Sequence, residues 1–271
     1  MRHPVRLIHA LLALALVVPV PALAQTEPAQ AAAPVRLAPV ELLPVVVPAK
    51  STPRPFSSIF SSLGGDFGRL VTPRSLLVLG AGGALATAVR PADRPVVMTL
   101  ARDNRVEEVL DPGSTLGSGE MQVGAAFGTW AIGKLVHRPA VQNLGADLLE
   151  AQIVAATLTH GLKFAVGRTR PDGTQFSFPS GHSSASFATA DILQQHFGWK
   201  VGLPAYALAG YVGTSRMSEN RHFLSDVIFG AAIGIASARS LSIGTRNARF
   251  AVTPVPTQGG AAIMVTAIPK R

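Results

Sequence analysis

The chain has 271 residues, 48% of them hydrophobic, and carries 24 Lys and Arg against 15 Asp and Glu, for a formal net charge of +9. This is enough apolar material for one or two packed domains, and the basic balance suits anionic substrates or an anionic membrane surface. The chain has no cysteine, which excludes disulfides and thiolate metal sites, while scattered basic residues and 6% aromatic content argue against a nucleic-acid partner.

Residues 1–24 have the pattern of a secretory signal. Arg2 and Arg6 precede a short apolar run that ends in Ala22-Leu23-Ala24, a small-x-small cleavage pattern. We therefore expect export and a location in the periplasm or at the periplasmic face of the cell membrane. An uncleaved membrane anchor is the alternative.

Residues 25–55 are rich in Pro, Ala and Val, and the repeated prolines disfavour a regular helix, so an extended tether is predicted. Residues 56–246 are predicted to form the functional domain. Residues 247–271 contain two β-like runs around Gln258-Gly259-Gly260, which indicates a terminal β-hairpin.

Within 56–246 the pattern predicts an all-α bundle of about six core helices. Apolar, Ala- and Gly-rich segments bounded by capping residues and prolines mark the helices. The predicted ranges are 75–89, 121–133, 147–164, 183–197, 201–214 and 224–238. Asp147 and Glu150 are placed in the first turns of the third helix, where the helix dipole favours acids.

The uncharged runs in these helices are short for a membrane span. The longest, between Arg74 and Arg90 and between Lys200 and Arg216, fall below the roughly 20 residues that cross a bilayer. The lengths favour a soluble or peripherally attached bundle over an integral one.

Three polar clusters lie at predicted helix ends. The first is KFAVGRTRP, in which Lys163 lies in the last helical turns and Arg170 follows just beyond, so that both cations can reach one anion. Arg168, in the same stretch, is a weaker candidate for substrate contact. Taken alone, such cations also serve to complement a helix C-terminus.

The second cluster, Pro179-Ser180-Gly181-His182, comes directly before an apolar helix. Helix N-termini attract anions, Gly181 permits close approach of a ligand to the backbone, and Ser180 adds a hydroxyl donor. His182 can carry or release a proton near neutral pH. Taken alone, the cluster also fits a simple helix cap.

The third cluster is SRMSENRHFLSD, residues 215–226. Asp226 follows His222 by four residues, so both lie on one helical face, where a carboxylate can fix the tautomer of an imidazole and make it a better nucleophile. Arg216 adds a third cation. Arg221, beside the motif, is a second weaker candidate for substrate contact.

Together the clusters predict in-line phosphoryl transfer. His222 would attack phosphorus, His182 would protonate the leaving oxygen, and the cations would neutralise the equatorial oxygens. The sequence contains no motif for a metal site, so no cofactor is expected.

The motifs K-x6-RP, PSGH and SR-x5-H-x3-D, in this order, resemble the signature of the type 2 phosphatidic acid phosphatase superfamily, which includes acid phosphatases and vanadium haloperoxidases. The resemblance implies a helical bundle with the active site at one end and a phosphohistidine on His222, with His182 as acid and base. It gives Asp226 an orienting role and phosphate binding to five residues: Lys163, Arg170, Ser180, Gly181 and Arg216.

The predicted function is a metal-independent phosphatase that acts on a phosphomonoester or pyrophosphate, whether a lipid phosphate or a small phosphoester, in the bacterial cell envelope. The alternatives are a vanadate-dependent haloperoxidase and a non-catalytic anion-binding envelope protein. In the phosphatase, vanadate would be an inhibitor, and in the haloperoxidase it would be the cofactor.

Overall fold

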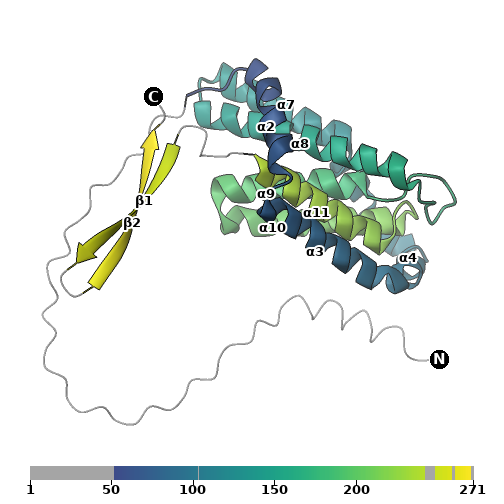
Figure 1. Cartoon of the computed structure of the whole chain (residues 1–271). Coiled ribbons are helices and arrows are strands. Elements are labelled where there is room, and N and C mark those ends of the chain that lie inside the picture. Colours follow the sequence, from purple (N-terminus) through teal and green to yellow (C-terminus); the bar gives the residue numbers. More distant parts are fainter. Residues whose placement is uncertain (1–51, 103, 242–247, 258–259, 270–271) are drawn as a thin grey trace, which may run out of the picture. The chain divides into compact units, whose positions relative to one another are not determined.

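The computed structural model describes residues 52–102, 104–241, 248–257 and 260–269 (Figure 1). In chain order its helices are α2 (Ser57–Arg69), α3 (Pro73–Val89), the short 3-10 helix η1 (Arg90–Ala92), α4 (Asp93–Leu100), α5 (Asn104–Leu110), α6 (Pro112–Leu116), α7 (Gly119–Leu135), α8 (Pro139–Val166), α9 (Gly181–Phe197), α10 (Trp199–Ser218) and α11 (Leu224–Ser240). The predicted all-α bundle is confirmed. The predicted signal segment and most of the predicted tether lie outside the described residues.

The predicted terminal hairpin is also present. Strand β1 (Ala248–Thr257) pairs antiparallel with β2 (Gly260–Pro269), and the register places Thr257 opposite Gly260 next to the turn. The turn residues 258–259 lie outside the described part of the chain. The division of the chain at residues 55 and 246 stays a prediction.

Helix α8 is longer than predicted, and this corrects the assignment of its acidic residues. It begins at Pro139, which suits the first helical position because the missing N–H is not needed there. Asp147 and Glu150 therefore lie well inside the helix, where both are buried. Arg54 forms ion pairs with both carboxylates, so a cation from a distant segment, and not the helix dipole, compensates them.

Helix α9 is the centre of the bundle and packs against α8, α10 and α11 (Figure 1). The approach of α11 is close because a Cβ at Gly230 would lie 2.5 Å from the carbonyl oxygen of Ser180, and one at Gly234 would lie 2.3 Å from that of Ser184. Ile192 and Ile233 are fully buried in the core between these helices. This packing holds the start of α9 against the start of α11.

The sequence predicts that no helical segment is long enough to cross a membrane, but the helical stretch Pro73–Leu100 is long enough. Helices α3 and α4 join through η1 into a 28-residue helical stretch, which passes by length and composition as the one candidate span among the described residues. Only 11% of its most apolar 18-residue window is buried. The prediction was wrong here because it counted uncharged runs, and the helical stretch continues through Arg90 and Pro91.

Candidate functional site

The first cluster lies where α8 ends. Gly167 closes the helix in the left-handed conformation at φ 59°, which glycine adopts without a steric penalty. Lys163, in the last turn, donates a hydrogen bond from Nζ to the carbonyl oxygen of Phe176 at 2.7 Å. The segment after Gly167 therefore folds back over the helix end and brings Arg170 with it.

Lys163 and Arg170 share a site with excess positive charge. The pKa of Lys163 is lowered to about 8, first by burial and then by the charge of Arg170, against the opposing effect of Asp226. Burial also lowers the pKa of Arg170, followed by the charge of Arg221. An anion placed between these cations would relieve both their desolvation and their mutual repulsion.

The second cluster caps α9 as the sequence predicts. Ser180 is the N-cap, and its Oγ accepts from the backbone N–H of Ser183 at 3.3 Å. A Cβ at Gly181 would lie 4.0 Å from Cε of Lys163, so the first turn of α9 faces the end of α8. The peptide bond between Phe178 and Pro179 is cis.

His182 lies in the first turn of α9, beside α6. Burial lowers its pKa to about 4, and the charges of Arg216 and His222 act in the same direction. A hydrogen bond with the backbone of Ser114 opposes this shift. His182 is therefore neutral at neutral pH until an anion offsets the surrounding positive charge.

The third cluster occupies the end of α10 and the start of α11. Arg216 is buried and donates from Nη1 to Oε2 of Glu219 at 2.6 Å, and Oε1 of Glu219 accepts from the Ser215 hydroxyl at 3.0 Å. The chain then folds back, and the backbone N–H of His222 donates to the carbonyl oxygen of Arg216 at 3.1 Å. Glu219 is thus a counter-ion within the protein for Arg216, one of the residues predicted to bind phosphate.

His222 and Asp226 are both buried and face each other. Nδ1 of His222 lies 3.8 Å from Oδ2 of Asp226, within ion-pair range and longer than a hydrogen bond. The pKa of His222 is lowered to about 4, first by burial and also by the charges of Lys163 and Arg170, while Asp226 acts in the opposite direction. Because Nδ1 faces Asp226, Nε2 is the ring nitrogen left to meet a ligand.

Asp226 is held by several donors. Its Oδ2 accepts from the hydroxyl of Ser177 and from the backbone N–H of Phe223, and its Oδ1 accepts from Nη1 of Arg168 at 2.6 Å. Burial alone would raise the pKa of this carboxyl, but interactions with His222, Ser177, Phe223 and Arg168 give a net lowering. The carboxylate is therefore charged and fixed in place.

Arg168 does not have the role in substrate contact that was considered from the sequence. It is neither solvated nor free for substrate, because Nη1 also donates to the Ser225 hydroxyl at 2.8 Å and Nη2 pairs with Oδ2 of Asp93 at 2.8 Å. Asp93 is buried and accepts from both the N–H and the hydroxyl of Ser225. Arg168, Asp93 and Ser225 form a layer behind Asp226 that sequence reasoning missed.

Arg221 also has a partner of its own. Its Nη1 pairs with Oδ2 of Asp172 at 3.0 Å, and the backbone N–H of Asp172 donates to the carbonyl oxygen of Asn220. These contacts join the segment after α8 to the segment before α11.

Three site residues keep buried nitrogen atoms without a hydrogen-bond partner among the described residues: Nε of Arg170, Nε of Arg216 and Nδ1 of His222. Such atoms are rare in folded proteins and need an explanation. Here they gather at one end of the bundle with Lys163 and His182. The arrangement can hold a multivalent oxyanion between two imidazoles. Within the described residues no group of three or more acids and histidines could hold a metal ion.

Comparison with known proteins finds a family similarity for part of the chain. A protein-family model described as the PAP2 superfamily matches residues 144–249, which include all three clusters. The matched residues are less than half of the chain. The predicted resemblance is thereby confirmed, and the PAP2 segment runs from within α8 into β1.

Curated relatives of this chain are named as lipid A phosphatases. Lipid A 1-phosphatase of Porphyromonas gingivalis is 38% identical over 96 residues, which are 34% of this chain and 21% of the relative. Lipid A 4'-phosphatase of Helicobacter pylori is 30% identical over 99 residues, 32% of this chain and 50% of the relative. The chain thus spans at most about half the length of these relatives.

Two solved structures were also found. Aquifex aeolicus LpxE is 21% identical with a TM-score of 0.46, over 54% of this chain and 92% of the other. A transmembrane PAP2-type phosphatidylglycerolphosphate phosphatase from Bacillus subtilis is 24% identical with a TM-score of 0.44, over 68% of this chain and 92% of the other.

Proposed function

We propose that this chain is a metal-independent phosphatase that removes a terminal phosphate from a lipid phosphate through a phosphohistidine on His222. The observation that carries the proposal is the pair of buried, unpartnered Nε atoms of Arg170 and Arg216 in one site with Lys163 and the two imidazoles of His182 and His222. Neutral donors or a single cation would suit many ligands. Three cations around two imidazoles suit a phosphoryl group in transfer.

The proposed reaction has two steps. Nε2 of His222 attacks phosphorus, the bond to the leaving oxygen breaks, and His182 gives its proton to that oxygen. Water then attacks the phosphohistidine, His182 takes the proton of that water, and His222 is released with inorganic phosphate. Lys163, Arg170 and Arg216 stabilise the equatorial oxygens, and Ser180 and Gly181 donate to them from the start of α9.

The low pKa of both imidazoles suits this sequence of steps. At neutral pH the free His222 is an uncharged nucleophile. His182 has a pKa of about 4 in the free site because of burial and the positive charge of its neighbours. A bound phosphate dianion offsets the positive charge around His182, so substrate binding raises the pKa of His182. His182 then takes up the proton that it later gives to the leaving oxygen.

The lipid nature of the substrate is supported by the surface of the bundle. Helices α3, α7 and α10 expose large apolar side chains, including Leu77 at 73%, Leu135 at 76% and Leu203 at 68%. Exposed apolar side chains of this size on several helices suit contact with a membrane. The names of the relatives, lipid A phosphatases, point to the same class of substrate, and we propose a site at the periplasmic face of the membrane.

The decisive experiment traps the intermediate. The detergent-solubilised full chain is incubated with a ³²P-labelled lipid phosphate and quenched, and acid-labile label on the protein is measured together with phosphate release from the lipid and from a soluble ester. We expect labelled wild type, about a 10⁴-fold or greater loss of turnover in His222→Asn, and inhibition by vanadate.

The matched control is His137→Asn. His137 is exposed, precedes α8 at the end away from Lys163, and has a positive φ of 52° that asparagine tolerates. This variant should behave as wild type. Full turnover in His222→Asn would overturn the proposal, as would halide oxidation that depends on added vanadate. Phosphate binding without any turnover would leave only the anion-binding alternative.

A further inference from the structure

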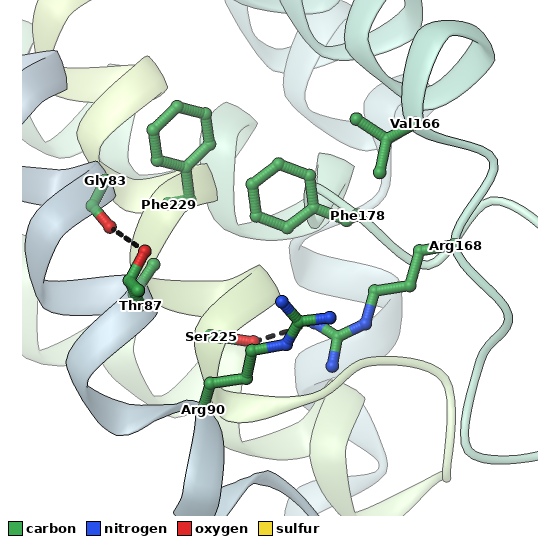
Figure 2. Close-up of a pocket in the computed structure, with 9 residues that line it drawn as sticks. Gly83, Thr87, Arg90, Val166, Arg168, Phe178, Ser225 and Phe229 are labelled. Carbon is green, nitrogen blue, oxygen red and sulfur yellow. Dashed lines mark hydrogen bonds between the residues drawn. The ribbon is translucent and has the colours of Figure 1, made fainter.

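A cavity lies behind the candidate active site. It has a volume of about 250 Å³ and lies between α3, the end of α8, the segment before α9 and the start of α11 (Figure 2). Its lining residues are Gly83, Ala86, Thr87, Arg90, Val166, Arg168, Phe178, Ser225 and Phe229. None of the proposed phosphate ligands and neither histidine of the proposed mechanism is among them. The cavity is therefore a different site from the phosphate cradle.

The wall that separates the two sites is the layer behind Asp226. Arg168 and Ser225 line the cavity, and Arg168 also donates to Oδ1 of Asp226. Asp226 in turn faces His222 across 3.8 Å. A ligand in the cavity would thus be two residues away from the proposed nucleophile.

The cavity has one apolar wall and one cationic wall. Phe178 and Phe229 stack with ring centroids 5.0 Å apart, and Figure 2 shows their rings on one side with the guanidinium groups of Arg90 and Arg168 on the other. Thr87 contributes little polarity because its hydroxyl donates to the carbonyl oxygen of Gly83 in its own helix at 2.8 Å. The shape suits a ligand with an acidic group and an apolar part.

The charge available to such a ligand comes from Arg90. The guanidinium of Arg168 is already neutralised by Asp93 and Asp226. Arg90 is exposed, and no hydrogen bond or ion pair joins its side chain to another residue in the described part of the chain. One free cation matches one negative charge.

We propose that this cavity binds an anionic membrane lipid as a second ligand, with its acidic headgroup on Arg90 and part of a chain against Phe178 and Phe229. A lipid is the occupant because Gly83, Ala86, Thr87 and Arg90 all belong to the helical stretch whose apolar window is almost entirely unburied. Arg90 ends α3, where the apolar run of that helix stops, and a cation in that position suits an anionic headgroup.

Binding should activate the enzyme. Arg90 and Arg168 both line the cavity, and their like charges repel. A negative headgroup on Arg90 would offset this repulsion and so strengthen the existing bond of Arg168 to Asp226, which faces His222. This consequence depends on the proposed phosphatase function, whereas the binding itself does not.

The test uses the full chain in neutral detergent micelles. Phosphatidylglycerol, a phosphodiester without a terminal phosphate to remove, is titrated against phosphatidylcholine, and thermal unfolding is followed alongside turnover of a soluble phosphoester. We expect saturable stabilisation and a rise in kcat with phosphatidylglycerol alone. In Arg90→Gln the half-saturating fraction should rise about fivefold, as for loss of one partly exposed ion pair.

Two further variants make the test specific. Arg94→Gln removes the same charge from an exposed position four residues on, outside the cavity, and should respond as wild type. Thr87→Phe fills the cavity from its exposed wall and should abolish the response while keeping basal turnover.

Each other outcome counts against the proposal. An equal response of Arg90→Gln and Arg94→Gln would show general surface attraction. Stabilisation by sodium sulfate that depends on Arg90 would show an anion site with no need for a lipid chain. Stabilisation that depends on Arg90 in a chain without any turnover would sustain the lipid site and remove only the phosphatase.

Discussion

The two ends of the α8–α9 pair both concentrate buried charge, and they differ in how that charge is compensated. At the end formed by Asp147, Glu150 and His196, Arg54 pairs with both carboxylates, and Nε2 of His196 lies 3.0 Å from Oδ2 of Asp147. At the opposite end, Lys163 and Arg170 form no ion pair with a carboxylate among the described residues, and the buried Nε atoms of Arg170 and Arg216 have no hydrogen-bond partner there. The ion pairs of Arg54 hold distant segments of the chain together, whereas cations without a carboxylate partner are suited to bind an anionic ligand.

The largest effect should come from the unpaired end. Arg170→Gln removes one of the three cations around the proposed phosphoryl group and should lower kcat/KM about 10³-fold, as expected for one charged group that stabilises the transition state. Stability should stay equal or rise, because Arg170 is partly desolvated and depresses the pKa of Lys163. Steady-state kinetics and thermal unfolding measure both. A large loss of stability would show that Arg170 is structural and break the contrast.

The paired end should give the opposite result. Arg54→Gln leaves Asp147 and Glu150 buried without their cation and should cost about 3 kcal/mol of unfolding free energy, with kcat unchanged in the folded fraction. Chemical denaturation measures the loss. Arg138→Gln, an exposed arginine at the start of α8, is the control and should be neutral. Unchanged stability in Arg54→Gln would mean that the ion pairs contribute nothing.

Much of the site could be predicted from the sequence because its chemistry is local. Each cluster combines residues a few positions apart at a helix end, so spacing alone places Ser180 as a cap and brings His222 close to Asp226. The predicted shared helical face is wrong, because His222 precedes Phe223, the N-cap of α11. The order of the clusters then supplies the family. The three clusters meet because α9 packs against α8, α10 and α11, which brings the end of α8, the end of α10 and the start of α11 to the start of α9.

The supporting layer could not be predicted in the same way. Asp93 accepts a hydrogen bond from Ser225, which lies 132 positions away in the sequence. No local sequence pattern predicts that contact. Arg54 compensates Asp147 and Glu150 over a similarly long separation, so a rule about first-turn acids gave the wrong start for α8. Long-range pairing of buried charge overrides the local preferences on which sequence reasoning depends.

Acid should destabilise the protein through its buried imidazoles. The pKa of His222 is about 4 in the folded chain against 6.5 as the ordinary value, so between these pH values the unfolded state binds more protons. Stability is therefore full above pH 6.5 and falls as pH decreases towards 4, and His222 contributes a loss of about 2 kcal/mol at pH 5.

His222→Asn provides the comparison for this effect. Its unfolding free energy should fall less between pH 7 and pH 5 than that of wild type, by about the same 2 kcal/mol. Saturating inorganic phosphate should flatten the wild-type slope, because a bound anion raises the pKa of the imidazoles in the folded state. Identical pH slopes for the two proteins would show that His222 is not held neutral by burial.

The smallest effect concerns Glu219, the ion-pair partner of the predicted phosphate ligand Arg216. Its carboxylate bonds to Nη1 of Arg216, so it competes with a phosphate oxygen for the same donor. Glu219→Gln should strengthen inhibition by inorganic phosphate about three- to tenfold, because removing the competing charge on a partly exposed residue is worth roughly 1 kcal/mol. Asp172→Asn, which removes the partner of Arg221 instead, is the matched control and should change inhibition less. Weaker inhibition in Glu219→Gln would mean that the carboxylate holds Arg216 in its binding position, and the contrast between paired and unpaired charge would then fail inside the site itself.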